Sequence, residues 1–303
     1  MNLPLVDLLS AARHAAGAQD YPKGALYMLA TPIGNRADMT LRGLHVLDLA
    51  DLVACEDTRH TATLLQAYGL HKPLLAAHEH NEREAAQTVL ARLREGQRVV
   101  YVSDAGTPGV SDPGARLVAE VRAAGLRCVP VPGVSSVTAL LSVGGHDGGD
   151  GGFRFAGFLP AKGAERDRAL QALAADAQAC VLLEAPHRIE ALARDLGVHL
   201  GPRPVTLGRE LTKQFEEITV QPADRLADWL AQGDQRKRGE FVLLVHADTA
   251  VAEGEDMHAA ALKVLDALLG ELPVKTAVKL AAQITGAPRN ALYDAALARK
   301  PSG

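Results

Sequence analysis

The ten residues Val99-Val100-Tyr101-Val102-Ser103-Asp104-Ala105-Gly106-Thr107-Pro108 decide the fold of this chain. A run of β-branched and aromatic residues, typical of a buried strand, stops abruptly at a loop of small residues. In an open parallel sheet, ligands bind at the carboxyl ends of the strands, where this loop is expected to lie. Asp104 offers a compact acceptor, and Gly106 permits close approach to the backbone. The acid favours a ligand that carries hydroxyl groups or positive charge over a phosphate.

The composition is that of an ordered globular protein. The chain has 303 residues, of which 48% are hydrophobic and 22% charged, and its net charge is −4. This length allows about two domains. There is no apolar run long enough for a membrane span and no secretory signal pattern. Three separated cysteines, Cys55, Cys128 and Cys180, indicate a reducing compartment. We therefore expect a cytoplasmic protein, and the negative balance argues against a broad nucleic-acid-binding face.

Short apolar runs alternate with helical stretches along most of the chain, which predicts two α/β domains. Expected strands in the first half lie at 26–30, 52–55, 99–102 and 128–131. Expected helices between and after them lie at 41–49, 82–94, 115–124 and 137–141, the third of them capped by Ser111-Asp112-Pro113. In the second half, strands are expected at 153–158, 180–184, 205–208, 217–220 and 241–246. Two of these are close enough to form a hairpin, so the second sheet is predicted to be mixed.

The predicted plan divides the chain into five segments. They are an N-terminal extension (1–22), an N-terminal α/β domain (23–143), a glycine-rich linker loop (144–152), a C-terminal α/β domain (153–248) and a helical tail (256–300). Two short helices around a glycine turn in the tail resemble a helix-turn-helix in outline. The alternative is a packing appendage without a binding role.

Two polar segments follow strands of the first domain directly. The loop Thr31-Pro32-Ile33-Gly34-Asn35 is either a ligand loop or only a βα turn, and it lacks the glycine pattern of a nucleotide site. The cluster Glu56-Asp57-Thr58-Arg59-His60 can supply general-base or hydroxyl-orienting carboxylates. Its alternative is structural, because Asp57 and Thr58 can cap the next helix. The density of charge at a predicted ligand edge favours function.

Three further motifs carry histidine, acidic or basic side chains. His78-Glu79-His80 lacks a third ligand at a suitable spacing, so we expect no metal and a helix start with Asn81 as cap. Glu184 is followed by Pro186, His187 and Arg188 after a strand of the second domain. Arg209 and Lys213 follow another strand and can neutralise phosphates or pair with Glu210 on the surface. No serine or cysteine hydrolase pattern is present.

Taken together, these motifs resemble one known family. The segments that carry the resemblance, in chain order, are 31–35, 56–61, 103–108, 112–114, Pro132-Gly133, 157–160, His187-Arg188, 209–213 and 239–242. This order is similar to that of the ribosomal RNA small subunit methyltransferase I family, a branch of the tetrapyrrole methylase superfamily. The likeness covers roughly residues 25–248, and Arg289-Asn290-Ala291-Leu292-Tyr293 in the tail also looks like that branch.

The resemblance implies a class III methyltransferase fold with two α/β domains, usually in a homodimer. S-adenosyl-L-methionine is expected in the cleft between the domains, and the expected reaction is 2′-O-methylation of a cytidine ribose in the decoding centre of 16S rRNA, within the small ribosomal subunit. The implied cofactor residues are Ser103, Asp104, Ala105, Gly106, Thr107, Ser135, Ser136, Phe158, Glu184, Leu211 and Glu240. The candidate catalytic residues are Glu56, Asp57, Arg59 and His60, and the candidate substrate-binding residues are Thr31, Pro32, Gly34, Asn35, Arg188, Arg209 and Lys213.

Two other functions stay open at this point. One is methylation of a tetrapyrrole on the shared scaffold, against which the cluster at 56–61 and the basic tail argue. The other is a ribosome-assembly factor that binds cofactor or RNA without catalysis. The expected placement of Asp104 beside a positively charged methyl donor accounts for an acid where a phosphate site would use lysine.

Overall fold

A computed structural model describes residues 5–78, 81–110, 114–145, 152–248 and 260–298. Its first sheet has five parallel strands in the order β3-β2-β4-β1-β5. Their bounds are β1 (Ala25–Leu29), β2 (Leu52–Cys55), β3 (Leu74–Ala76), β4 (Val99–Val102) and β5 (Arg127–Val131). β4 lies at the centre of the sheet and all its residues are buried. The run Val99–Val102, which precedes the loop of small residues at 103–108, is therefore the central strand.

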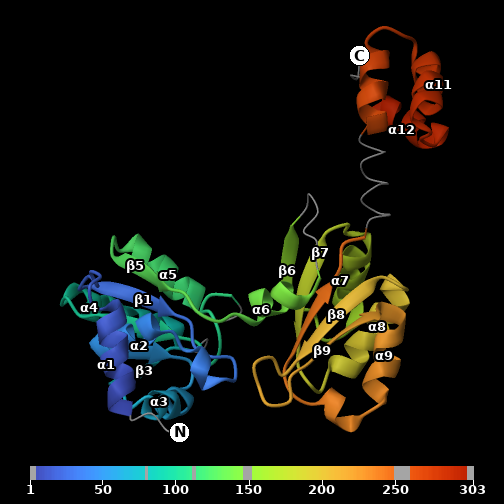
Figure 1. The fold of residues 1–303 in the computed structure, drawn as a ribbon. Helices are drawn as coiled ribbons and strands as arrows, with labels where there is room; N and C mark the ends of the chain where they lie inside the picture. The colour runs from blue at the N-terminus through green and yellow to red at the C-terminus, as the bar shows by residue number, and fades with distance from the viewer. Residues whose placement is uncertain (1–4, 79–80, 111–113, 146–151, 249–259, 299–303) are drawn as a thin grey trace.

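Helices cover both faces of this sheet (Figure 1). The helices of this part of the chain are α1 (Leu5–Ala16), η1 (Arg36–Asp38), α2 (Leu41–Leu49), α3 (Thr58–Ala67), α4 (Glu82–Arg94) and α5 (Gly114–Ala123). Side chains of β4 alternate between the faces: Val100 and Val102 pack with α1, α2 and α3, whereas Val99 and Tyr101 pack with α4 and α5. Burial on both faces explains why the strands read as continuous apolar runs.

The second sheet is mixed, as predicted, with the order β6-β7-β10-β8-β9. Its strands are β6 (Phe153–Phe158), β7 (Ala179–Glu184), β8 (Pro204–Arg209), β9 (Glu217–Pro222) and β10 (Phe241–Val245). β6 and β7 run parallel, and the other three pairs are antiparallel. The helices α7 (Gly163–Ala175), α8 (Ile189–Leu200) and α9 (Ala223–Ala231) pack on one face around Leu182, Leu207 and Leu243, and η2 (Asp234–Lys237) follows α9.

The other face of the second sheet packs against α6 (Ser136–Val143), which lies between the two sheets in Figure 1. Leu140 of α6 is fully buried among side chains of β7 and β10, including Val181 and Leu244. Ile33, from the loop after β1, belongs to the same apolar cluster. This cluster therefore joins the loops of the first sheet to the inner face of the second.

The helical tail has an apolar core of its own. Residues 260–269 are helical, followed by α11 (Val274–Thr285) and α12 (Arg289–Ala298). Gly286, with φ of 74°, ends α11 in the left-handed conformation that favours glycine. The buried residues of the tail, among them Leu265, Val278 and Leu292, pack with one another. Figure 1 shows this red segment apart from both sheets.

The predicted α/β fold class is confirmed: two five-stranded sheets, each packed against helices, are followed by a helical tail. Most expected strands and helices are present with ends shifted by a few residues at most; β3 was not predicted. The cap at 111–113 and most of the linker loop at 144–152 lie outside the described residues, as do 1–4, 256–259 and 299–300 of the outer segments. The division into five segments stays a prediction. In the part of the chain that the structure describes, no helix combines the length and apolar character needed to cross a membrane.

Candidate active site

A cavity of about 410 Å³ lies where loops of the first sheet meet the inner face of the second sheet. Its size is that of a site for a small molecule. The first sheet and its loops contribute Ile33, Glu56, Ser103, Asp104, Ala105, Gly106, Thr107 and Val110. The start of α6 and the second sheet contribute Ser135, Ser136, Val137, Phe158, Leu183, Glu184, Ala185, Pro186, Leu211, Glu240, Phe241 and Val242. All eleven residues predicted for the cofactor are among them.

The loop after β4 forms the first wall, and backbone hydrogen bonds hold it to the loop after β1. Thr31 donates its N–H to the Gly106 carbonyl at 2.9 Å, and Gly106 donates its N–H to the Thr31 carbonyl at 3.0 Å. The hydroxyl of Thr107 donates to the Val134 carbonyl at 2.9 Å, just before α6. Gly106 has φ of 79°, so the turn that exposes this wall requires a glycine. The buried Thr31 therefore supports the wall from behind.

Glu56 and Asp57 follow β2 and have different surroundings. Glu56 lines the cavity, whereas Asp57 caps α3: its Oδ1 accepts hydrogen bonds from the N–H groups of Arg59 (2.8 Å) and His60 (3.3 Å). These backbone bonds lower the pKa of Asp57 below its ordinary value. Asp57 also donates its own N–H to Oδ1 of Asp104 at 3.2 Å, which places the two acidic loops side by side. The capping interpretation is confirmed, and Arg59 and His60 are exposed at the start of the helix.

The second wall contains a buried carboxylate at the end of β7. Glu184 is 2% exposed, and its Oε1 accepts the N–H of Ala185 at 2.9 Å and lies 3.1 Å from Nε of Arg188. Its Oε2 is buried, and no residue of the described ranges donates a hydrogen bond to it. A buried acceptor without a donor is costly, and such groups mark sites where a ligand completes the network. Phe158 on the same wall is 52% exposed, which is unusual for a ring of that size.

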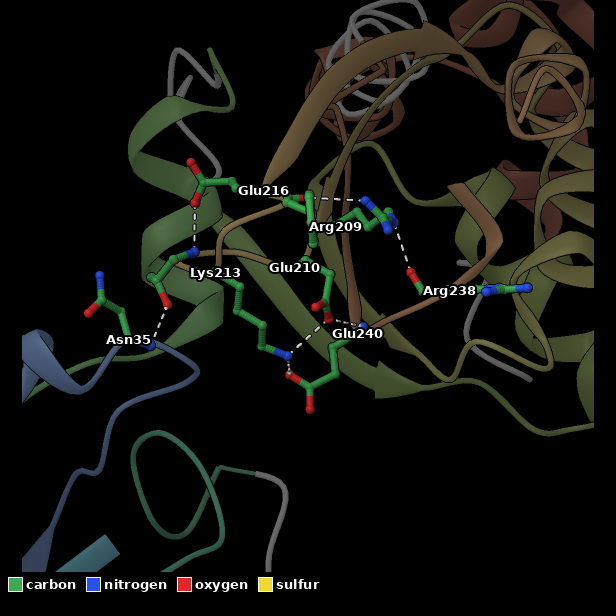
Figure 2. Close-up of polar contacts among 9 residues, drawn as sticks. Asn35, Arg209, Glu210, Lys213, Glu216, Arg238 and Glu240 are labelled. Atoms are coloured by element: carbon green, nitrogen blue, oxygen red, sulfur yellow. Dashed lines mark hydrogen bonds and ion pairs between the residues drawn. The ribbon is translucent and has the colours of Figure 1, made fainter. Parts of the chain in front are cut away.

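None of the residues predicted to bind substrate lines the cavity; they lie in the loops and strand ends next to it. Arg209 is buried, and its guanidinium donates to the carbonyls of Arg238 (2.8 Å) and Phe215 (3.0 Å), as Figure 2 shows in part. Arg188 pairs with Glu184 and donates to the Leu159 carbonyl. Pro32 and Gly34 are in the loop after β1. Asn35 caps η1 with its side chain, and its N–H donates to Oγ1 of Thr212 at 3.2 Å.

Lys213 pairs with Glu210 at 2.9 Å and with Glu240 at 3.1 Å (Figure 2). Burial alone would lower the pKa of Lys213, but its hydrogen bonds to the two carboxylates raise it above its ordinary value. For Glu210, burial acts to raise the pKa, and hydrogen bonds from the Glu240 N–H and from Lys213 outweigh it and lower the pKa. Lys213 and Glu210 therefore both stay charged near neutral pH.

The sequence motifs gave no site role to the apolar part of the cavity. The lining residues without a predicted role are Ile33, Val110, Val137, Leu183, Ala185, Pro186, Phe241 and Val242, several of which belong to motifs quoted above. Each lies next to a predicted strand end or helix start, and that position was the available signal. Asn81 occupies the N-cap position of α4, as predicted, but its Oδ1 accepts the His78 N–H at 2.9 Å and makes no hydrogen bond to the first turn of the helix. Glu79 and His80 lie outside the described residues, and within those no group of acids, histidines and cysteines is arranged to hold a metal.

Two family models match the chain. The model for Tetrapyrrole (Corrin/Porphyrin) Methylases covers residues 25–227, and the RsmI C-terminal HTH domain covers residues 255–300. The ribosomal RNA small subunit methyltransferase I of Pseudomonas aeruginosa is 48% identical over 91% of this chain and 98% of that protein. The protein of the same name from Escherichia coli O157:H7 is 46% identical over 92% and 96%. This chain belongs to the ribosomal RNA small subunit methyltransferase I family.

Solved structures show the fold that this methyltransferase I family shares with tetrapyrrole methylases. Cobalt precorrin-4 methyltransferase superposes with a TM-score of 0.56 at 20% identity, covering 75% of this chain and 98% of that one. Uroporphyrin-III-C-methyltransferase from Thermus thermophilus gives 0.51 at 23% identity, covering 73% and 94%. Another structure of that Thermus enzyme, complexed with S-adenyl homocysteine, gives 0.51 at 20% identity over 73% and 96%. The resemblance derived from the sequence is thus confirmed at the level of family and fold.

Proposed function

We propose that this chain transfers the methyl group of S-adenosyl-L-methionine to the ribose 2′-hydroxyl of a cytidine in the decoding centre of 16S rRNA, within the small ribosomal subunit. Family membership supports an S-adenosylmethionine-dependent methyltransferase that acts on ribosomal RNA. The choice of nucleotide, of the 2′-oxygen and of the decoding centre rests on the resemblance of the sequence motifs to this family, and the cavity bears on the cofactor.

The charge of the cavity lining is the observation that carries this proposal. Four carboxylates, those of Glu56, Asp104, Glu184 and Glu240, line it, and no lysine, arginine or histidine does so among the residues described. A site for free phosphate uses basic side chains or bidentate arginine. Carboxylates instead suit a sulfonium cation, an ammonium group and ribose hydroxyls, all of which S-adenosylmethionine carries. The four carboxylates of the lining therefore fit this cofactor.

Glu184 provides a second, independent test of the fit. Glu184 lines the cavity, and its Oε2 is buried without a hydrogen-bond donor from the described chain. S-adenosylmethionine offers amino and hydroxyl donors that can satisfy such an acceptor. Arg188 lies behind Glu184 and holds its other oxygen, so the carboxylate is oriented before a ligand arrives. We therefore assign Arg188, and likewise the buried Arg209, to the support of the wall.

When bound, the cofactor supplies an electrophilic methyl carbon, and the protein's task is to align the 2′-oxygen with it. Positioning of this kind can provide most of the acceleration. We assign Glu56 to orienting the 2′-hydroxyl and accepting its proton, because Glu56 lines the cavity and Asp57 is engaged in the helix cap. Asp104 is assigned to the cofactor. Arg59, His60, Lys213 and the loop residues Pro32, Gly34 and Asn35 are assigned to the RNA side, whereas the buried Thr31 is assigned to the support of that loop.

The decisive experiment measures transfer of a tritiated methyl group from S-adenosylmethionine to small ribosomal subunits that lack the modification. We expect label in 16S rRNA, recovered as 2′-O-methylcytidine after digestion to nucleosides. Label on a base, or on another nucleoside, would refute the proposed chemistry. Transfer to a tetrapyrrole instead of the subunit would support the first alternative, and cofactor or RNA binding without any transfer would support the assembly factor.

The oligomeric state and location are proposed on the family resemblance alone. We propose a homodimer that works in the cytoplasm, where ribosomal subunits are assembled. Sedimentation analysis at micromolar concentration should give twice the mass of the chain, 31.9 kDa. A monomer at concentrations that support full methyl transfer would contradict the dimer.

A further inference from the structure

The turn between β8 and β9 has a strained backbone. Glu210 has φ of 50° and Thr212 has φ of 68°, and in the described part of the chain these two are the non-glycine residues with positive φ. A β-branched residue such as threonine is a clear outlier in this region. Such conformations persist only where the surrounding structure holds them, and they gather at functional sites.

The carboxylate of Glu210 is the centre of the contacts that hold this turn (Figure 2). Its Oε1 accepts the N–H of Glu240 at 2.9 Å and the ammonium of Lys213 at 2.9 Å. The backbone of Glu210 donates to the Glu240 carbonyl at 3.0 Å, so the turn is tied to the start of β10 in both directions. A Cβ at Gly239 would lie 2.5 Å from this carboxyl, which shows how closely Glu210 packs there.

The residues that follow Glu210 contact two other parts of the site, the cavity and the loop after β1. Leu211 lines the cavity and is 7% exposed, packed in the apolar cluster that also holds Ile33. Oγ1 of Thr212 accepts the Asn35 N–H from the loop after β1, and the stem of Lys213 packs over Gly34. Glu210 itself does not line the cavity. Glu210 instead contacts Glu240, which lines the cavity, and Lys213, which packs against the loop after β1.

We propose that Glu210 is a positioning residue for the methyl donor: its carboxylate holds the strained turn so that Leu211 forms a wall of the cavity while Thr212 and Lys213 contact the loop of Gly34 and Asn35. This inference rests on the proposed function, because the ligand whose affinity it controls is S-adenosylmethionine. Without the carboxylate, the turn relaxes, Leu211 leaves the wall and the donor binds less tightly. Contacts of the wall are the same before and during transfer, so their loss raises KM and leaves kcat nearly unchanged.

The test compares Glu210→Ala with the full-length unmodified chain in steady-state methyl transfer to small subunits and in calorimetric titration with S-adenosylhomocysteine. We expect the KM for S-adenosylmethionine and the Kd for S-adenosylhomocysteine each to rise about tenfold, with kcat within about twofold. Glu210→Gln keeps an acceptor for the Glu240 N–H and should recover most of the affinity. If the alanine variant does not fold, Glu210→Asp withdraws the carboxylate by one carbon and should raise the KM about threefold.

Glu217→Ala is the matched control. Glu217 on β9 pairs with Arg236 at 3.0 Å, is partly exposed like Glu210, and does not line the cavity. Its KM for the donor should equal that of the unmodified chain. A folded Glu210 variant with unchanged KM, or with a lower kcat alone, would overturn the inference, since loss of active protein reduces kcat only. If the unmodified chain fails to bind S-adenosylhomocysteine, the proposed function falls, and this inference falls with it.

Discussion

Adjacent acidic residues at this site differ in where they lie: one lines the cavity and the other caps a helix. Glu56 and Asp57 are both acids after β2, and the sequence does not distinguish them. In the structure the backbone N–H groups at the start of α3 occupy Oδ1 of Asp57, whereas Glu56 faces the cavity. Across the cavity, burial and Arg188 fix Glu184 in a single orientation. Chemical role at this scale follows from hydrogen-bond geometry.

Glu56→Gln should lower the kcat of methyl transfer by about 100-fold, because an amide cannot accept the proton of the 2′-hydroxyl. S-adenosylhomocysteine affinity, measured by calorimetry, should change little. Glu95→Gln, which alters an exposed acid paired with Arg92 at the end of α4, serves as control and should be fully active. Transfer by Glu56→Gln within twofold of the unmodified rate would show that Glu56 has no role in moving or orienting the proton.

Glu184→Gln tests the buried acceptor. The substitution preserves shape but replaces one carboxylate oxygen with a donor group and removes the ion pair with Arg188. We expect about a tenfold weaker Kd for S-adenosylhomocysteine, since hydrogen bonds to charged groups are stronger than those to neutral ones. Glu190→Gln, at an exposed carboxylate of α8 that pairs with Lys237, should bind like the unmodified chain. Equal Kd values for all three proteins would remove Glu184 from the proposed site.

At the scale of elements, the start of α3 places the charged cluster beside the loop after β4. Asp57 begins the helix, and its own N–H reaches Asp104. Thr40 plays the same part for α2, where its Oγ1 accepts the Gly43 N–H at 2.9 Å. The two caps differ in charge, because a carboxylate titrates and a hydroxyl does not. Their contributions to stability should therefore depend differently on pH.

The melting temperature of Asp57→Ala should lie below that of the unmodified chain near neutral pH, and the difference should shrink in acid. The pKa of Asp57 is lowered in the folded state by hydrogen bonds from the backbone N–H groups of Arg59 and His60. A group with a lowered folded-state pKa adds stability that is present above its unfolded pKa of about 3.9 and is lost as the pH falls through the folded value. Melting curves from pH 7 to pH 3 measure this; for Thr40→Ala the difference should not vary with pH. Parallel behaviour of the two variants would contradict the assignment.

Elements with a strong local signal were predictable. β4 was placed to the residue because a buried β-branched run ends abruptly in small residues, and α2 and α4 also had the expected bounds. β3 (Leu74–Ala76) is too short to show a period, so it was missed. The left-handed residues Glu210 and Thr212 were also missed, because glycine and asparagine are the usual signals for that conformation. There the conformation is imposed by Glu240 and Asn35, which are distant in sequence.

The candidate site was predictable where it consists of polar residues at strand ends. Such residues stand out because an acid directly at or after a buried apolar strand lies at the ligand edge of a parallel sheet, as Asp104 and Glu184 do. The apolar lining did not stand out, because Ile33 and Val137 look like ordinary core residues in sequence. The sequence also does not distinguish the polar residues that support the fold: the guanidinium of Arg209 donates to two backbone carbonyls from segments distant in sequence or beyond the strand end.

At the scale of the whole molecule, the described part of the tail has an apolar core of its own and contributes no residue to the lining of the cavity. The apolar cluster of 260–298 consists of tail residues, and the cavity is lined by residues up to Val242. The tail carries Lys275, Lys279 and Arg289, whereas the cavity lining is acidic. We therefore infer that the tail adds contacts with a large polyanionic substrate to those of the loops beside the cavity.

A chain that ends at Asp248 should bind S-adenosylhomocysteine with the Kd of the full-length protein. Its methyl transfer to small subunits should fall at least about tenfold, mainly through a higher KM for the subunit, because basic contacts with RNA are lost. Calorimetry and label transfer at two salt concentrations separate these effects, and the full-length protein should show the steeper salt dependence. Equal transfer by both proteins would leave the tail without a part in substrate binding.

The paired hydrogen bonds between Thr31 and Gly106 have a consequence for the order of events in a catalytic cycle. They join the wall that is assigned to the donor and the loop that is assigned to the RNA into one piece of backbone. A ligand that immobilises one therefore immobilises the other, so the second ligand meets a loop whose motion has already been restricted. Such coupling is reciprocal: each substrate should strengthen the binding of the other. If the loop binds RNA as proposed, the spent donor should still restrain it after transfer, and we predict that departure of the spent donor precedes release of the finished particle.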